Sequence, residues 1–294
     1  MAKVGAGSEV ARKDGVIVGP LRRSVNASQQ AKGSIHNDEV ATKLGFRGGT
    51  VAGSIHLELF PPLLVEAFGP RWFERGSLSI YFVNATTDRE AVRAHVGEPP
   101  DGGDAQVEAW IEREDGMRVG EGTAAVGDPG DLPALHQRQL DKFPAGELRM
   151  FSGLEAGHRF DEADVRLGRE LQDTRLRHGQ ITEPLEWYDA GSPWGGPVAS
   201  PATMVHLLYQ EAARQLGKLS GPSVGLFGAI ELRNVDGPVL LDRDYRLSGQ
   251  IVAVGQSPKT EYVWFDTAAD DGDRRVAEMR MLMRWMKASS PRYQ

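Results

Sequence analysis

Apolar and polar residues alternate along several stretches of this chain, with the period of a half-buried β-strand. Residues 91–96 and 106–112 alternate cleanly, and residues 77–83 alternate before becoming fully apolar. Such alternation, bounded by Gly, Pro and Asp, predicts strands. The predicted strands are residues 16–18, 77–83, 91–96, 106–112, 119–126, 225–232, 243–254, 259–267 and 275–286.

Two other stretches carry apolar residues at the three-to-four spacing of a helix. They are residues 55–68 and 204–216, and they end at Gly69 and Gly217. Pro61-Pro62 interrupts the first stretch, so its helix either kinks there or starts a new turn with proline at its first position. Each helix precedes a run of antiparallel strands, which predicts an α+β fold.

The second half of the chain repeats the first. The sequence Gly-Gly-Thr-Val-Ala-Gly at residues 48–53 returns as Gly-Gly-Pro-Val-Ala-Ser at 195–200, an offset of 147 in a chain of 294 residues. The same order of helix and strands follows each copy, which indicates a duplication. The Pro/Gly/Asp-rich residues 128–133 mark a linker. The predicted organisation is an N-terminal unit (1–130), a linker (131–150) and a C-terminal unit (151–294).

Composition excludes several classes of function. The net charge of −7 argues against a nucleic-acid partner held by phosphate contacts. The absence of cysteine excludes disulfides, thiolate metal sites and a cysteine nucleophile. No apolar run of 18 residues and no signal-peptide core are visible, so we expect no membrane span and a cytoplasmic location.

The candidate chemistry lies in residues 35–53. His36 and Asp38 stand two residues apart, and a Gly-rich elbow then leads into the first predicted helix. A titratable pair beside the free N–H groups of a helix start suits proton transfer at a thioester. Two plainer interpretations stay open: His36 as a surface or capping residue, and Asp38 as the N-cap of a helical turn over residues 39–44.

The pattern Ile35-His36-x-Asp38, Ala41, Gly45-Phe46 and Gly53 resembles the MaoC-like, or hydratase 2, branch of the hot-dog superfamily. The resemblance implies a double hot-dog fold, with two antiparallel sheets, each wrapped around a central helix, related by a pseudo-twofold axis. It also implies a hydro-lyase, a hydratase or dehydratase acting on a 2-enoyl or 3-hydroxyacyl thioester. The aspartate that this family carries five residues before the histidine is Ala31 here.

The resemblance assigns His36 to proton transfer between water and the substrate carbon, and Asp38 to orienting it. Backbone N–H groups near Gly53 would polarise the thioester carbonyl. No metal or redox cofactor is implied, since coenzyme A or a carrier pantetheine belongs to the substrate. The partner is a small-molecule acyl thioester, and a homodimer is a further expectation. The residues expected to bind substrate are Gly48, Gly49, Thr50, Val51, Gly53, His56, Trp187 and Trp194.

The second repeat lacks the titratable pair. Adding 147 to His36 and Asp38 gives Glu183 and Leu185. We therefore expect the C-terminal unit to be a substrate-binding scaffold with a degenerate site. Trp187 and Trp194 are either plugs of the core or, as we favour, a wall for an apolar acyl chain.

Three rival functions remain open from the sequence. A thioesterase would need a carboxylate near the first helix, for which Glu58 is the candidate. The second rival is an isomerase or cyclase of a biosynthetic pathway, and the third is a non-catalytic acyl-binding protein. Either would explain why Ala31 replaces the aspartate of the family.

Overall fold

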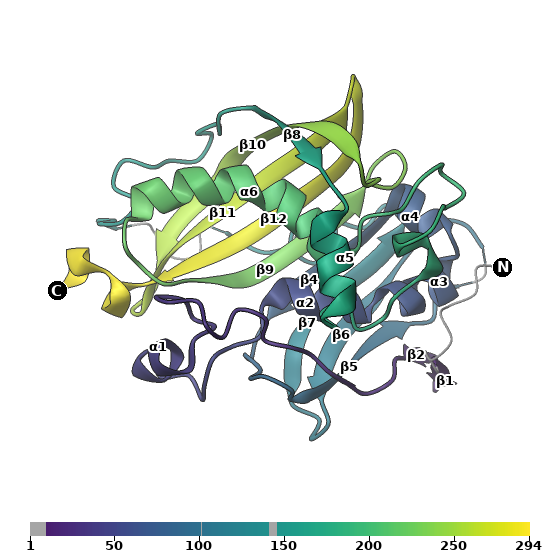
Figure 1. Ribbon diagram of the computed structural model, residues 1–294, viewed down its shortest axis with the longest axis horizontal. Helices are drawn as coiled ribbons and strands as arrows, with labels where there is room; N and C mark the ends of the chain where they lie inside the picture. The colour runs from purple at the N-terminus through teal and green to yellow at the C-terminus, as the bar shows by residue number, and fades with distance from the viewer. Residues whose placement is uncertain (1–9, 101, 141–145) are drawn as a thin grey trace.

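The structure is a computed structural model that describes residues 10–100, 102–140 and 146–294. One antiparallel sheet of twelve strands dominates it (Figure 1). The strands are β1 (Ala11–Lys13), β2 (Val16–Val18), β3 (Arg22–Arg23), β4 (Gly76–Phe82), β5 (Ala91–Gly97), β6 (Ala105–Arg113), β7 (Arg118–Val126), β8 (Ala163–Leu167), β9 (Gly225–Asn234), β10 (Arg243–Gln256), β11 (Thr260–Asp271) and β12 (Arg274–Met286). The prediction of separate strands over both halves is confirmed to within a few residues.

The two halves share this sheet. Its order is β1-β2-β5-β6-β7-β4-β9-β12-β11-β10-β8, with β3 also paired to β5. β4 and β9 pair antiparallel at the centre, residues 77–81 against 229–233. The prediction of two sheets is therefore wrong. The first strand after the central helix of each half, β4 or β9, completes its hydrogen bonds on the other half instead of ending as an open edge.

The strand order supports the duplication. Outward from the centre, one side runs β4, β7, β6, β5, β2 and the other runs β9, β12, β11, β10, β8. In each half the first and fourth strands after the helix are therefore neighbours. Equivalent strands lie at equivalent places on both sides of the β4–β9 pair.

The two predicted helices differ in form. The first is broken into α2 (Gly53–His56), the 3₁₀ turn η1 (Leu57–Leu59) and α3 (Pro61–Phe68). A new helix thus starts at Pro61, the second of the two alternatives that the prolines left open. The second helix, α6 (Pro201–Ser220), runs through Gly217 and lies across the strands of the C-terminal half (Figure 1).

The remaining helices are short. They are α1 (Asp38–Lys43), α4 (Arg71–Arg75), α5 (Glu170–Arg177), η2 (Glu186–Tyr188), η3 (Lys287–Ser289) and η4 (Pro291–Tyr293). The charged sequence of α5 and β8 gave no apolar period, so neither element was predicted. The N-cap of α1 is Asn37, whose side chain accepts from the Val40 N–H at 3.3 Å. The prediction of Asp38 as the cap is wrong, because Asp38 is already the first helical residue.

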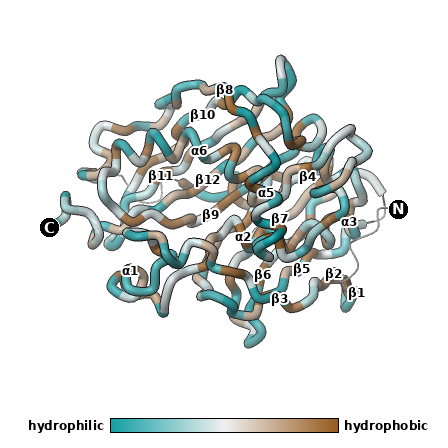
Figure 2. Tube along the Cα trace, in the orientation of Figure 1, coloured by the Kyte–Doolittle hydropathy of each residue, from teal (hydrophilic) through white to brown (hydrophobic). Residues whose placement is uncertain are grey.

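One hydrophobic core spans both halves. A single cluster of buried side chains contains Leu78 and Ile80 of β4 together with Ile230 and Leu232 of β9. Figure 2 shows hydrophobic and hydrophilic positions interleaved along α6 and the strands, as expected for elements with one buried face. No helix in the described part of the chain is long and apolar enough to cross a membrane.

The predicted linker packs against the face of the sheet opposite to α6. Leu135 is fully buried there and belongs to a smaller cluster with Tyr262 and Trp264. The described linker residues, 131–140 and 146–150, form turns and bends without a helix. Residues 141–145 of that linker lie outside the described residues.

Candidate functional site

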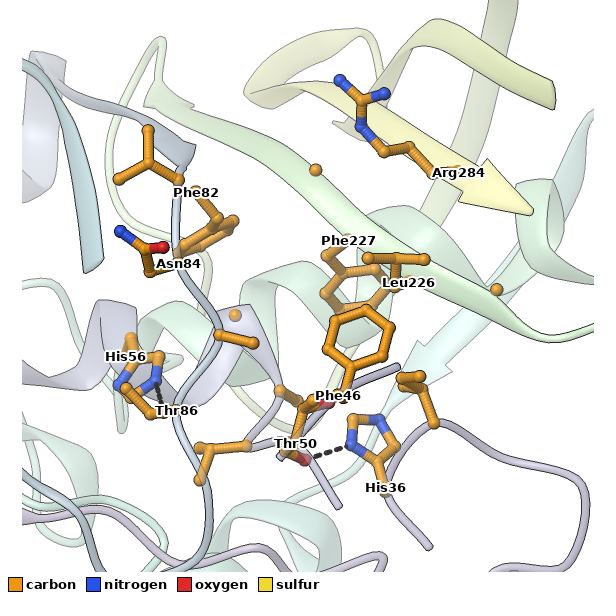
Figure 3. A pocket seen from close by; sticks show the side chains of 18 residues that line it. His36, Phe46, Thr50, His56, Phe82, Asn84, Thr86, Leu226, Phe227 and Arg284 are labelled. Carbon is orange, nitrogen blue, oxygen red and sulfur yellow. Dashed lines mark hydrogen bonds between the residues drawn. The ribbon is translucent and has the colours of Figure 1, made fainter. Parts of the chain in front are cut away.

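A pocket of about 180 Å³ lies where the two halves meet (Figure 3). The N-terminal half contributes the elbow before α2 and the segment after β4. The C-terminal half contributes the start of β9 and one side chain of β12. The lining residues are Ile35, His36, Phe46, Thr50, Val51, Ala52, Gly53, His56, Phe82, Val83, Asn84, Ala85, Thr86, Gly225, Leu226, Phe227, Gly228 and Arg284.

His36 is held against this pocket by a backbone carbonyl. Its Nδ1 lies 2.6 Å from the carbonyl oxygen of Thr50. Because a carbonyl oxygen only accepts, Nδ1 carries the proton and Nε2 has the free lone pair. The backbone of the elbow is fixed as well, since Thr50 N donates to Ile35 O at 3.1 Å. In the neutral ring this arrangement leaves Nε2 of a partly exposed histidine free to accept a hydrogen bond.

Asp38 lies outside the pocket, so the structure does not bring the predicted His36–Asp38 pair together there. Its carboxylate accepts from Gly49 N at 2.8 Å and from Gln29 Nε2 at 2.8 Å. The Gly49 hydrogen bond lowers the pKa of Asp38. The carboxylate therefore stays charged and fixes the elbow whose next residue, Thr50, orients His36.

Gly48 and Gly49 also lie outside the pocket lining, but Gly49 is packed against His36. A Cβ on Gly49 would come within 2.1 Å of the His36 carbonyl oxygen, whereas a Cβ on Gly48 would meet its nearest atom, Asp38 Oδ1, at 3.3 Å. Real Cβ atoms do not approach backbone as closely as 2.1 Å. The elbow thus needs glycine at 49 and has more room at 48.

The matched pair Gly49→Ala and Gly48→Ala tests this packing. We expect Gly49→Ala to lower the free energy of unfolding by about 1–3 kcal/mol, as other overpacked positions do. We expect Gly48→Ala to change it by less than about 1 kcal/mol. Denaturant unfolding of both variants measures the difference. Equal losses in the two variants would contradict the role of Gly49.

Gly53 and His56 bring α2 close to the end of β4. A Cβ on Gly53 would lie 2.5 Å from Phe82 Cε2. His56 is 2% exposed, and its Nε2 lies 2.7 Å from Thr86 Oγ1. Burial lowers the pKa of His56 to about 4, so this ring is neutral near pH 7. Four of the substrate-binding residues predicted from the sequence line the pocket beside His36. They are Thr50, Val51, Gly53 and His56.

A buried carboxyl joins the two halves beside this pocket. Glu58 is fully buried, and its Oε1 accepts from Ser200 Oγ and from Ala202 N, both at 2.7 Å. It therefore binds the first turn of α6 from the other half. Burial raises the pKa of Glu58 to about 7. The sequence showed Glu58 as a carboxylate near the first helix, but not this contact between halves.

In the second repeat, the position that corresponds to His36 in the sequence is buried. Glu183, the counterpart of His36, is 1% exposed and pairs with Arg22. Trp187 is 5% exposed, and Trp194 packs edge-on against it with ring centroids 5.2 Å apart. Phe73 completes the cluster at 5.5 Å from Trp187. Neither tryptophan lines the His36 pocket: Trp187 is a buried plug of the core, and Trp194 is partly exposed and packs against it.

Sequence reasoning missed the contribution of the second half to the pocket. Leu226 and Phe227 lie in a predicted strand without any signal that distinguishes them. Arg284 does interrupt an otherwise apolar stretch, Met281 to Met286, and that charge was the available signal. Among the residues that the structure describes, no group of three or more His, Asp or Glu could hold a metal ion.

Comparisons with known proteins agree on the fold. No family model and no curated protein matches the sequence. A MaoC domain protein of Chloroflexus aurantiacus, named as a candidate dehydratase, matches with a TM-score of 0.61 at 12% identity, over 94% of this chain and 95% of its own. A MaoC-like dehydratase matches with a TM-score of 0.54 at 15% identity, over 93% and 98%.

A third solved structure is described by its fold. It is a conserved hypothetical protein of Mycobacterium tuberculosis described as having a double hot-dog fold, with a TM-score of 0.56 at 11% identity over 91% of this chain and 94% of its own. At such identities the likeness concerns the fold alone. The chain therefore has the double hot-dog fold of these proteins and is similar in structure to MaoC-like dehydratases over about 94% of its length.

Proposed function

We propose that this chain is a hydratase or dehydratase that acts on a 2-enoyl or 3-hydroxyacyl thioester in the His36 pocket. The observation that carries the proposal is His36 itself, with Nδ1 bound to the Thr50 carbonyl and Nε2 available as a base. The similarity in fold to MaoC-like dehydratases supports the reaction class.

In the proposed hydration, His36 Nε2 takes a proton from water while the water oxygen bonds to C3 of the enoyl group. The C2=C3 electron pair moves toward C2 and the thioester oxygen, and C2 then receives the proton from His36 Nε2, which regenerates the base. Dehydration is the same path reversed. A positioned base of this kind contributes about 10²- to 10⁴-fold in rate.

The thioester oxygen gains negative charge during this reaction. In the proposal it lies near the backbone N–H groups of Gly53 and Ser54, which open α2. Preorganised donors of this type are worth about 10²- to 10³-fold in rate. Asp38 holds the elbow through Gly49, and the second half supplies the apolar wall of Leu226 and Phe227.

One observation favours a second candidate, an acyl-binding protein without turnover. None of the described residues that line the pocket carries a carboxylate, and Ala31 stands where the hydratase 2 pattern has its aspartate. The thioesterase alternative gains no support, because its candidate carboxylate, Glu58, is fully buried and bound to α6.

A direct assay separates these functions. Crotonyl-CoA and a longer enoyl-CoA are incubated with the protein, while loss of the conjugated enoyl thioester and release of free thiol are measured in parallel. We expect loss of the enoyl thioester without thiol. Thiol release would indicate a thioesterase, and saturable binding without either change would indicate a binding protein.

A further inference from the structure

A guanidinium group lies at the end of the pocket remote from His36. Arg284 is on β12, directly opposite Leu226 of β9 in the ladder. Figure 3 shows His36 and Arg284 at the two ends, with Phe46, Leu226 and Phe227 between them. Arg284 is partly buried, and it is the one lining side chain that is charged at every physiological pH.

Arg284 has neutral partners. Its Nη2 donates to Tyr81 Oη at 2.8 Å, and its guanidinium carbon lies 5.8 Å from the centre of the Tyr262 ring. Within residues 10–100, 102–140 and 146–294, no carboxylate forms an ion pair with Arg284. By contrast Arg280, four positions earlier on β12, binds both oxygens of Asp266 at 2.8 Å.

The guanidinium without an anionic partner indicates which chemical group the ligand carries. A half-buried charge is normally paired, and a guanidinium matches a carboxylate or phosphate with two parallel hydrogen bonds. Among the described residues, none of the 18 that line the pocket is acidic, so these residues supply no anion there. An anionic group on the bound molecule would complete the arrangement.

We propose that Arg284 binds a carboxylate on the acyl group, so that the substrate is a monothioester of a short dicarboxylic acid. This inference rests on the proposed function, because it places the thioester near His36 and Gly53. The pocket of about 180 Å³ is smaller than the roughly 300–1,000 Å³ of sites for drug-sized ligands. Two amide-linked segments separate the phosphates of coenzyme A from its sulfur. Those phosphates therefore lie beyond such a pocket when the thioester is inside it.

The test compares two thioesters that differ only at the far end of the acyl group. Fumaryl-CoA carries a carboxylate where crotonyl-CoA carries a methyl group. We expect the wild-type protein to prefer fumaryl-CoA. We expect Arg284→Met to raise the KM or Kd for fumaryl-CoA at least tenfold, while the values for crotonyl-CoA stay within about twofold. Arg284→Lys, which keeps the charge but not the paired geometry, should give an intermediate loss.

The control is Arg243→Met, an exposed arginine of β10 outside the pocket lining, which should leave both thioesters unaffected. Equal weakening of both thioesters by Arg284→Met would place its anion on the coenzyme and overturn the proposal. So would an unchanged preference in a folded variant.

Equilibrium binding separates this inference from the proposed reaction. If fumaryl-CoA binds in an Arg284-dependent way without turnover, the carboxylate site stands and the hydratase assignment fails. If crotonyl-CoA is hydrated but fumaryl-CoA gains nothing from Arg284, the reverse holds. Inorganic phosphate and free fumarate are then compared as competitors of fumaryl-CoA binding. If phosphate competes as well as fumarate, and does so only when Arg284 is present, Arg284 forms a general anion site and the proposed carboxylate site is contradicted.

Discussion

Replacing His36 with alanine is expected to lower kcat for thioester hydration by about 10²- to 10⁴-fold, the contribution of a positioned general base. The side chain is partly exposed on a pocket, and its ring is hydrogen-bonded to the Thr50 carbonyl, so we expect little packing to be lost with it. We therefore expect the melting temperature to change by only a few degrees. Steady-state kinetics with the best enoyl thioester, beside a thermal unfolding curve, measures both effects.

The matched control is His178→Ala, an exposed histidine at the end of α5. It should retain both the rate and the melting temperature of the wild-type protein. Wild-type kcat in a folded His36→Ala protein would remove His36 from the mechanism.

Replacing Glu58 with glutamine is expected to stabilise the protein at pH 8. Burial raises the pKa of Glu58 from its ordinary 4.5 to about 7, so the folded state holds this proton more tightly than the unfolded state. The stability linked to Glu58 is complete below pH 4.5 and is lost as the pH rises to about 7. The difference corresponds to about 3 kcal/mol. Glutamine keeps the Oε1 that Ser200 and Ala202 bind, without the charge.

Denaturant unfolding at pH 4.5 and pH 8 measures this effect. The gain of Glu58→Gln over the wild-type protein should be present at pH 8 and nearly absent at pH 4.5. Glu155→Gln, at an exposed position, should show no gain at either pH. A gain of equal size at both pH values would show that ionisation of Glu58 is not its cause.

The strands could be predicted because alternation is a local property, but their partners could not. Residues 77–83 and 225–232 both read as strands, and nothing in either stretch indicates that they pair with each other. That pairing joins residues about 150 positions apart and turns two expected sheets into one. Period-two alternation specifies which face of a strand is buried, not which strand lies beside it.

The residues of the candidate site likewise fall into two groups, those that the sequence showed and those that it did not. His36, Thr50, Val51, Gly53 and His56 could be found because one short stretch carries them. Leu226, Phe227 and Arg284 reach the pocket from strands more than 150 residues away in the chain. For Trp187 and Trp194 the sequence suggested a wall of the binding site, but both pack against Phe73 of α4, a residue more than 100 positions earlier in the chain, and neither lines the pocket.

The buried residues His56 and Glu58 have a joint consequence for the proton balance of unfolding. Between about pH 4.5 and 6.5 the folded protein keeps Glu58 protonated and His56 neutral, whereas in the unfolded chain Glu58 is ionised and His56 becomes charged. Stability linked to His56 is lost as the pH falls toward 4, opposite in sign to that of Glu58. Unfolding thus moves one proton from residue 58 to residue 56 with little net exchange with solvent. The two residues together leave stability nearly level across a range where either alone would make it slope.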